Sequence, residues 1–195
     1  MKFKLDTKTI TGIGILLAIE IVLQVVGNFV AIGPISINLS LVPIVIAALL
    51  YGPWGGFILG FFCGVLVLPS GFAVMLMGYN PICTVLICLL KTSIAGFLAG
   101  LVYLPFKEKE DKLKIVGTVL AGLTVPVINT GIFVGMMLLC FQDYLQTAST
   151  GFANPFTFVI LGLVSWNFIF EVVSTSVLSP TIYKIVDILK KRANQ

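Results

Sequence analysis

Residues 80–105 read NPICTVLICLLKTSIAGFLAGLVYLP, an apolar stretch that contains a single charged residue, Lys91. An apolar run of about 20 residues is long enough to cross the hydrocarbon core of a bilayer as an α-helix. Pro81 stands near the start of the run and Pro105 at its end, the places where prolines open and close helices. The stretch therefore predicts a transmembrane helix.

The composition of the whole chain agrees with this reading. Of the 195 residues, 58% are hydrophobic and 10% are charged, and the mean hydropathy is +1.12. An ordinary soluble domain is about 25% charged, so this chain has too few solvated groups to cover a globule. We therefore expect an all-α membrane protein made of a single transmembrane domain over residues 1–195. A soluble enzyme, a nucleic-acid-binding protein and a disulfide-linked secreted module are excluded.

Turn residues divide the apolar runs into six predicted transmembrane helices. Gly52-Pro53 and Pro69-Ser70-Gly71 are examples of such breaks. The segments 72–79 and 142–155 are predicted to be loops on one side of the membrane, and the first of them is unusually apolar. The predicted spans are residues 9–32, 35–51, 55–68, 80–104, 115–141 and 156–188.

The placement of lysine and arginine predicts the orientation. Three of the twelve basic residues precede the first span, four lie in the charged loop 107–114, and four lie at or after Lys184. With six spans, these three regions fall on the same side of the membrane. Because cytoplasmic loops are enriched in Lys and Arg, we expect both termini to be cytoplasmic.

Several kinds of chemistry are missing from the sequence. There is no histidine, which excludes a His-ligated metal and a Ser-His-Asp triad. The chain lacks Gly-x4-Gly-Lys-Ser/Thr, so it does not itself carry a P-loop for nucleotide hydrolysis. The four cysteines lie in apolar segments and are interpreted as structural thiols. We expect no catalytic residue, no metal and no cofactor.

Three ionisable residues fall inside the predicted spans: Glu20, Lys91 and Glu171. Such a residue costs about 2.5–3.5 kcal/mol on insertion scales, so it usually faces the interior of a helix bundle and has a partner there. Other polar residues accompany them on the last three spans. They are Asn80 and Thr84 on the face of Lys91, Asn129 and Thr130 just after Pro126, and Asn167 and Ser174 on the face of Glu171.

These polar faces predict one cavity, open to the outside, that binds a ligand. Trp166 near the outer mouth is a further candidate because its ring can stack on a ligand, although aromatic belts at membrane interfaces are ordinary. Two interpretations of Lys91 stay open. It contacts an anionic ligand, or it forms a structural ion pair with Glu171 or Glu20.

Small residues form a second pattern. Gly14 and Ala18 are four residues apart in the first span, as are Gly96 and Gly100 in the fourth. Small residues at this spacing let helices approach closely. The pattern is compatible with packing inside the bundle and with an interface to another membrane subunit.

Three stretches resemble a known family. They are residues 38–46 (NLSLVPIVI), residues 51–60 (YGPWGGFILG), and Asn80-Pro81 leading to residues 95–103 (AGFLAGLVY). Together they resemble the substrate-binding S components of energy-coupling-factor (ECF) vitamin transporters. Gly14 and Ala18 match the pair in the family's first helix that docks onto the coupling subunit. The usual pair there is Ala-xxx-Ala, so the glycine is a departure.

The resemblance implies a multi-pass subunit of a prokaryotic plasma membrane that is not an enzyme. Such a subunit binds a vitamin or related micronutrient from outside with high affinity, among the outer halves of helices four to six. It associates with a transmembrane coupling subunit and two cytoplasmic ATPase subunits.

Substrate identity depends on the polar residues of the cavity. Pantothenate ranks first because Lys91 offers a cation to a carboxylate, and riboflavin ranks next because aromatic residues near the mouth can stack on its rings. The alternative function is a small ion-coupled secondary transporter that uses Glu20 and Glu171.

Overall fold

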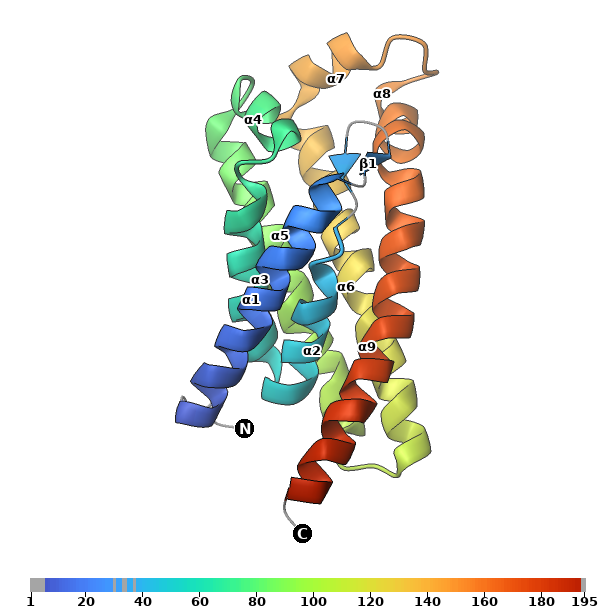
Figure 1. The fold of residues 1–195 in the computed structure, drawn as a ribbon. Coiled ribbons are helices and arrows are strands. Elements are labelled where there is room, and N and C mark those ends of the chain that lie inside the picture. Colours follow the sequence, from blue (N-terminus) through green and yellow to red (C-terminus); the bar gives the residue numbers. More distant parts are fainter. Residues whose placement is uncertain (1–5, 30, 33–34, 37, 194–195) are drawn as a thin grey trace.

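The chain folds almost entirely into helices, as a computed structural model shows for residues 6–29, 31–32, 35–36 and 38–193. The long helices run side by side in an elongated bundle (Figure 1). They are α1 (Thr7–Phe29), α2 (Leu41–Tyr51), α3 (Pro53–Val67), α5 (Pro81–Tyr103), α6 (Asp111–Cys140) and α9 (Ser165–Ala193).

Shorter elements connect these helices. A two-residue antiparallel pair, β1 (Ala31–Ile32) and β2 (Ile35–Ser36), separates α1 from α2, and the 3-10 turn η1 (Leu104–Phe106) follows α5. The short helices α4 (Gly71–Met77) and α7 (Gln142–Ala148) lie at the end of the bundle opposite to the two ends of the chain (Figure 1). The turn α8 (Pro155–Thr157) and the π-helix η2 (Phe158–Val164) lead into α9.

Four helical segments in the described ranges are long and apolar enough to cross a membrane: Thr7–Gly27, Pro81–Phe106, Asp111–Cys140 and Pro155–Thr181. A fifth is possible if α3 and α4, which meet at a bend of 77°, form one span. In the second predicted span, residues 35–51, the helix begins only at Leu41, because residues 35–36 belong to β2. Its 11 residues extend about 16 Å, roughly half of a bilayer core. The prediction of six full spans is therefore not confirmed by helix length.

α2 is apolar on every side, and the other helices enclose it. All residues from Leu41 to Leu49 are buried. A helix that is hydrophobic all round belongs in the interior of a bundle, in contrast to one with a single apolar face.

Two predicted loops are partly helical. Segment 72–79 falls largely within α4, where the Ser70 side chain caps the helix by accepting a hydrogen bond from Ala73 N at 3.3 Å. Segment 142–155 contains α7. A serine before an apolar run is a helix-start signal, and the prediction of a loop over 72–79 was wrong because α4 starts after Ser70. α6 continues through Pro126 as one helix.

Glycines allow α3 and α5 to pack closely. Gly56 and Gly96 face each other, and a Cβ atom added to Gly96 would lie only 2.7 Å from the Ile44 side chain. Further along the contact, Thr92 Oγ1 donates a hydrogen bond to the Gly60 carbonyl at 2.6 Å. The small residues of α5 therefore serve packing inside the bundle.

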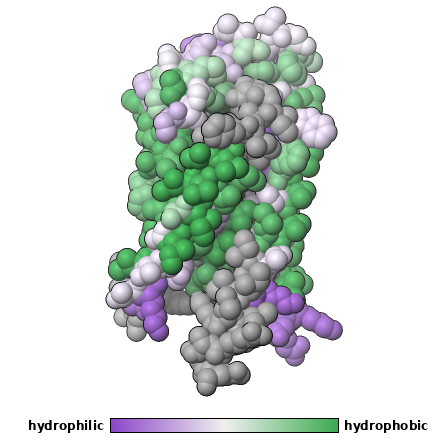
Figure 2. All heavy atoms as spheres, viewed as in Figure 1, coloured by the Kyte–Doolittle hydropathy of each residue, from purple (hydrophilic) through white to green (hydrophobic). Residues whose placement is uncertain are grey.

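The ends of the bundle differ from its middle. Figure 2 shows apolar side chains over the middle of this face, and hydrophilic residues near the start of α1 and the connection between α5 and α6. Exposed large apolar residues include Ile15 and Val22 on α1 and Val173 and Val177 on α9. At its start, α1 is capped by Asp6, and the hydrogen bonds from Thr9 hold the pKa of Asp6 below its ordinary value. An apolar band of this extent fits lipid and would be unfavourable in water.

Candidate ligand-binding site

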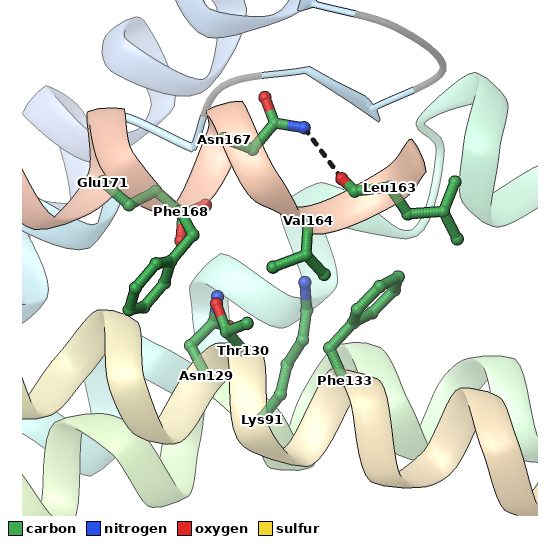
Figure 3. A pocket seen from close by; sticks show the side chains of 9 residues that line it. All are labelled: Lys91, Asn129, Thr130, Phe133, Leu163, Val164, Asn167, Phe168 and Glu171. Atoms are coloured by element: carbon green, nitrogen blue, oxygen red, sulfur yellow. Dashed lines mark hydrogen bonds between the residues drawn. The ribbon is translucent and has the colours of Figure 1, made fainter. Parts of the chain in front are cut away.

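A polar cavity lies between α5, α6 and the segment formed by η2 and α9 (Figure 3). Its free volume is about 330 Å³, including the part open to the surroundings. The lining residues are Lys91, Asn129, Thr130, Phe133, Leu163, Val164, Asn167, Phe168 and Glu171.

Lys91 supplies the cation of the cavity. It stands eleven residues after Asn80, about 16 Å along α5, which places it near the middle of the helix. Its Nζ lies 5.5 Å from the centroid of the Phe133 ring, which is within the range of a cation–π interaction. Within the described part of the chain, Lys91 forms no ion pair with a carboxylate. The ring therefore supplies part of its stabilisation, and no anion of the described residues neutralises it by direct contact.

α6 contributes an amide to the same space. Asn129 is buried, and its Oδ1 has no hydrogen-bond partner among the described residues. A buried polar atom without a partner costs roughly 1–3 kcal/mol, so a donor on a ligand or a water molecule would stabilise it. Thr130, the next residue, and Phe133, about one turn further along α6, also line the cavity.

α9 contributes a carboxylate and a second amide. Glu171 and Asn167 are both buried, and Asn167 Nδ2 donates a hydrogen bond to the Leu163 carbonyl at 3.2 Å. In Figure 3 the Glu171 carboxylate points toward the α5 and α6 side of the cavity. The preceding segment η2 is a π-helix, a widened form that often occurs at functional sites.

The cavity therefore presents a cation, a carboxylate and amides within an apolar surround. Such a set is chemically complementary to a small molecule that carries an anionic group and hydrogen-bonding groups. In the part of the chain that the structure describes, no group of three or more His, Cys, Asp or Glu residues is placed to hold a metal ion.

The structure brings together four of the seven residues predicted to bind substrate: Lys91, Asn129, Asn167 and Glu171. Asn80 instead caps α5, its side chain accepting a hydrogen bond from Cys83 N at 3.1 Å. Thr84 donates to the Asn80 carbonyl at 2.8 Å. Trp166 is 62% exposed on the outside of the bundle. These three do not line the cavity, and a role for them in binding stays a prediction.

Sequence reasoning did not single out the apolar lining of the cavity. Leu163, Val164 and Phe168 resemble lipid-facing residues in sequence, because apolar side chains occur on both the inward-facing and the lipid-facing surfaces of transmembrane helices. Phe133 carries a usable signal: it stands four residues after Asn129, on the same face of α6.

Aromatic side chains cover the cavity toward α4 and α7. Phe72 of α4 lies 6.2 Å from Phe133 and 6.3 Å from Tyr144, and Tyr144 lies 5.4 Å from Tyr79 and 6.3 Å from Phe158, all measured between ring centroids. Burial raises the pKa of Tyr144 above its ordinary value, and the neighbouring Tyr79 adds to the effect. Because Phe133 lines the cavity, Phe72 connects α4 directly to the cavity wall, and Tyr144 of α7 is connected to it through Phe72.

Gly14 and Ala18 lie elsewhere, on an exposed face of α1. A Cβ atom added to Gly14 would have no neighbour within 4 Å. This small-residue face is therefore not packed against another described helix of the chain.

Apolar helices around a partly enclosed polar cavity are the architecture of a multi-pass membrane protein with a candidate small-molecule site. Residues 8–183 match the family described as ECF transporter, substrate-specific component, and the chain belongs to this family. No curated protein and no solved structure matches the chain. The family is a transporter binding component and not an enzyme family, and its members associate with a membrane-embedded subunit and with ATPase subunits.

Proposed function

We propose that this chain is the high-affinity substrate-binding subunit of an ATP-driven ECF importer for a water-soluble vitamin, with pantothenate ranked first and riboflavin next. One observation carries the substrate proposal: Lys91 faces the cavity, and no carboxylate of the described residues is in ion-pairing contact with it. A carboxylate on the ligand would supply the missing anion, and charge-assisted hydrogen bonds of this kind are strong.

The remaining polar groups suit the rest of a pantothenate molecule. Its hydroxyl groups and amide N–H can donate to the Asn129 amide oxygen and to Glu171. Its apolar carbons fit against Val164 and Phe168.

The proposed topology has six spans, with the buried helix α2 as a short second span. Both ends of the chain and the connection between α5 and α6 lie at one end of the bundle (Figure 1). That connection and its flanks contain four lysines, at Lys107, Lys109, Lys112 and Lys114, which supports a cytoplasmic location for this end. The covering helices α4 and α7 then lie on the outer side, where a vitamin enters.

The proposed partners are a transmembrane coupling subunit and two cytoplasmic ATPase subunits of a prokaryotic plasma membrane. Gly14 and Ala18 would form the close contact with the coupling subunit, because their face of α1 is exposed and lacks large side chains at these two positions.

Direct binding measurements test the proposed function. The purified detergent-solubilised chain is titrated with pantothenate and with riboflavin, and small molecules that co-purify with it are identified by mass spectrometry. Saturable binding of pantothenate is the expected result. Binding of riboflavin alone would overturn the first-ranked substrate and keep the function, whereas failure of a full panel of water-soluble vitamins to bind would contradict the function itself.

A further inference from the structure

A second buried polar cluster lies away from the cavity, between α1, the start of α2, and α3. Its members are Glu20, Gln24, Asn38, Ser40 and Cys63, all of them buried. None of them lines the cavity around Lys91. The inner stripe of α1 runs through Ile13, Leu16, Glu20, Gln24 and Gly27, so the second half of this stripe is polar.

Among the described residues, no hydrogen-bond donor is placed to stabilise a carboxylate at Glu20. Glu20 is 0% exposed, and neither of its carboxylate oxygens has a hydrogen-bond partner among the described residues. An isolated charge in an apolar interior is very costly unless it is paired or coordinates a metal ion. The sequence contains no Lys, Arg or His between Lys8 and Lys91. Lys8 is about 18 Å away along the helix, and Lys91 lines the other cavity.

Ser40 stands at the centre of a group of oxygen atoms. Its Oγ lies 2.9 Å from Gln24 Oε1, is also in hydrogen-bond contact with Asn38 Oδ1, and lies 3.1 Å from Cys63 Sγ. A hydroxyl has one proton and cannot donate to both amide oxygens. Turning the side-chain amide of Gln24 or Asn38 by 180° would place an N–H group toward Ser40 and remove this conflict. Glu20 would still have no counter-charge.

Glu20 and Gln24 are neighbours on α1, because they stand four residues apart on its buried stripe. The buried thiol of Cys63 on α3 contacts Ser40 from the other side of the cluster. The carboxylate therefore belongs to the same small volume as the amide and hydroxyl oxygens.

We propose that Glu20, Gln24, Asn38 and Ser40 form a binding site for a monovalent metal cation, Na⁺. Hard cations prefer carboxylate, carbonyl and hydroxyl oxygens, and these four side chains supply that donor set. A single carboxylate matches a single positive charge, whereas a divalent ion would leave excess charge among apolar helices. The bound cation stabilises the second half of α1 against α2 and α3. The site is independent of the vitamin, so it can be tested without one.

Thermal unfolding of the full detergent-solubilised chain tests the site. NaCl is exchanged for choline chloride at constant ionic strength and constant pH. The wild-type chain should gain stability with Na⁺ in a saturable manner, because an ion that binds only the folded state raises the melting temperature. Glu20→Gln keeps the side-chain shape without the charge and should abolish the response. Glu171→Gln, which neutralises the other buried carboxylate, is the matched control and should retain it.

Ser40→Ala gives a graded test that does not depend on the Glu20 variant. It should raise the Na⁺ concentration at half-saturation by about 10-fold or more, within the range found for lost metal-site contacts. Equal melting temperatures in NaCl and choline chloride would overturn the site. An Na⁺ response that Glu20→Gln retains would also overturn the site. A melting temperature that depends on pH but not on Na⁺ would overturn it as well, because it would indicate a proton bound to Glu20. If Glu20→Gln does not fold, direct binding of radioactive ²²Na⁺ to wild type and Ser40→Ala decides the question.

Discussion

Lys91 and Glu171 line the same buried cavity from α5 and α9, yet they form no ion pair with each other. Two opposite charges in an apolar surround attract each other strongly, and their contact usually offsets part of the free-energy cost of removing them from water. Holding them apart leaves each available to a third group. A ligand between them can accept from Lys91 and donate to Glu171, and the first prediction addresses this arrangement.

Lys91→Met should weaken vitamin binding by about 2–5 kcal/mol, the usual loss when one member of a buried charged pair is removed. The melting temperature of the ligand-free chain should hold or rise, because methionine carries no charge into the membrane. Affinity and melting temperature are measured on the same preparation. Lys184→Met, at an exposed lysine outside the cavity, is the control and should keep the wild-type affinity. A destabilisation of about 3–5 kcal/mol with unchanged affinity would instead identify Lys91 as part of a structural ion pair.

Gly14→Leu and Ala18→Leu should block assembly with the coupling subunit through steric overlap at the exposed face of α1. Vitamin binding by the isolated chain should survive, because this face does not line the cavity. Co-purification of the complex provides the measurement. Gly131→Leu is a matched control on α6, where an added Cβ also meets open space. Variants of Gly14 and Ala18 that still assemble fully would exclude this face as the docking surface.

α4 should act as a lid over the ligand. Its Phe72 ring contacts Phe133 of the cavity wall, so a ligand that orders the wall should also order α4. Hydrogen exchange of residues 74–78 should slow when the vitamin is bound. The start of α6, far from the cavity, provides an internal reference that should not change. Identical exchange of 74–78 with and without vitamin would refute the lid.

Gly96→Ala should destabilise the chain by about 1–3 kcal/mol, because the new methyl group would press against the Gly56 backbone and the Ile44 side chain. Thermal unfolding provides the measurement. Gly135→Ala, at a helical glycine with open space around it, should be neutral or stabilising. Equal stability of the two variants would show that the approach of α3 and α5 is looser than described.

The sequence was most informative where a polar residue interrupts an apolar helix. Lys91, Asn129, Asn167 and Glu171 stand out for that reason, and the structure brings them around one cavity. The predicted span 80–104 also agrees closely with α5, because Asn80 caps the helix and Pro81 begins it.

Other features depend on tertiary contacts that an apolar sequence does not encode locally. The run 35–51 gives no sign that the helix starts at Leu41, since strand and helix residues there are equally hydrophobic. Asn80 and Thr84 share the helical face of Lys91, but local hydrogen bonds to the backbone occupy their side chains. Trp166 is adjacent to Asn167 in sequence, and the 100° turn of the helix points it outward.

Transport in reconstituted vesicles tests the central claim most directly. The chain is incorporated alone or together with the coupling subunit and both ATPase subunits, and uptake of radioactive pantothenate is followed with ATP, with a non-hydrolysable analogue, and with imposed Na⁺ or proton gradients. The account predicts uptake only in vesicles that contain the complete complex and hydrolyse ATP. Gradient-driven uptake by the chain alone would contradict it and would favour an ion-coupled secondary transporter that uses Glu20 and Glu171.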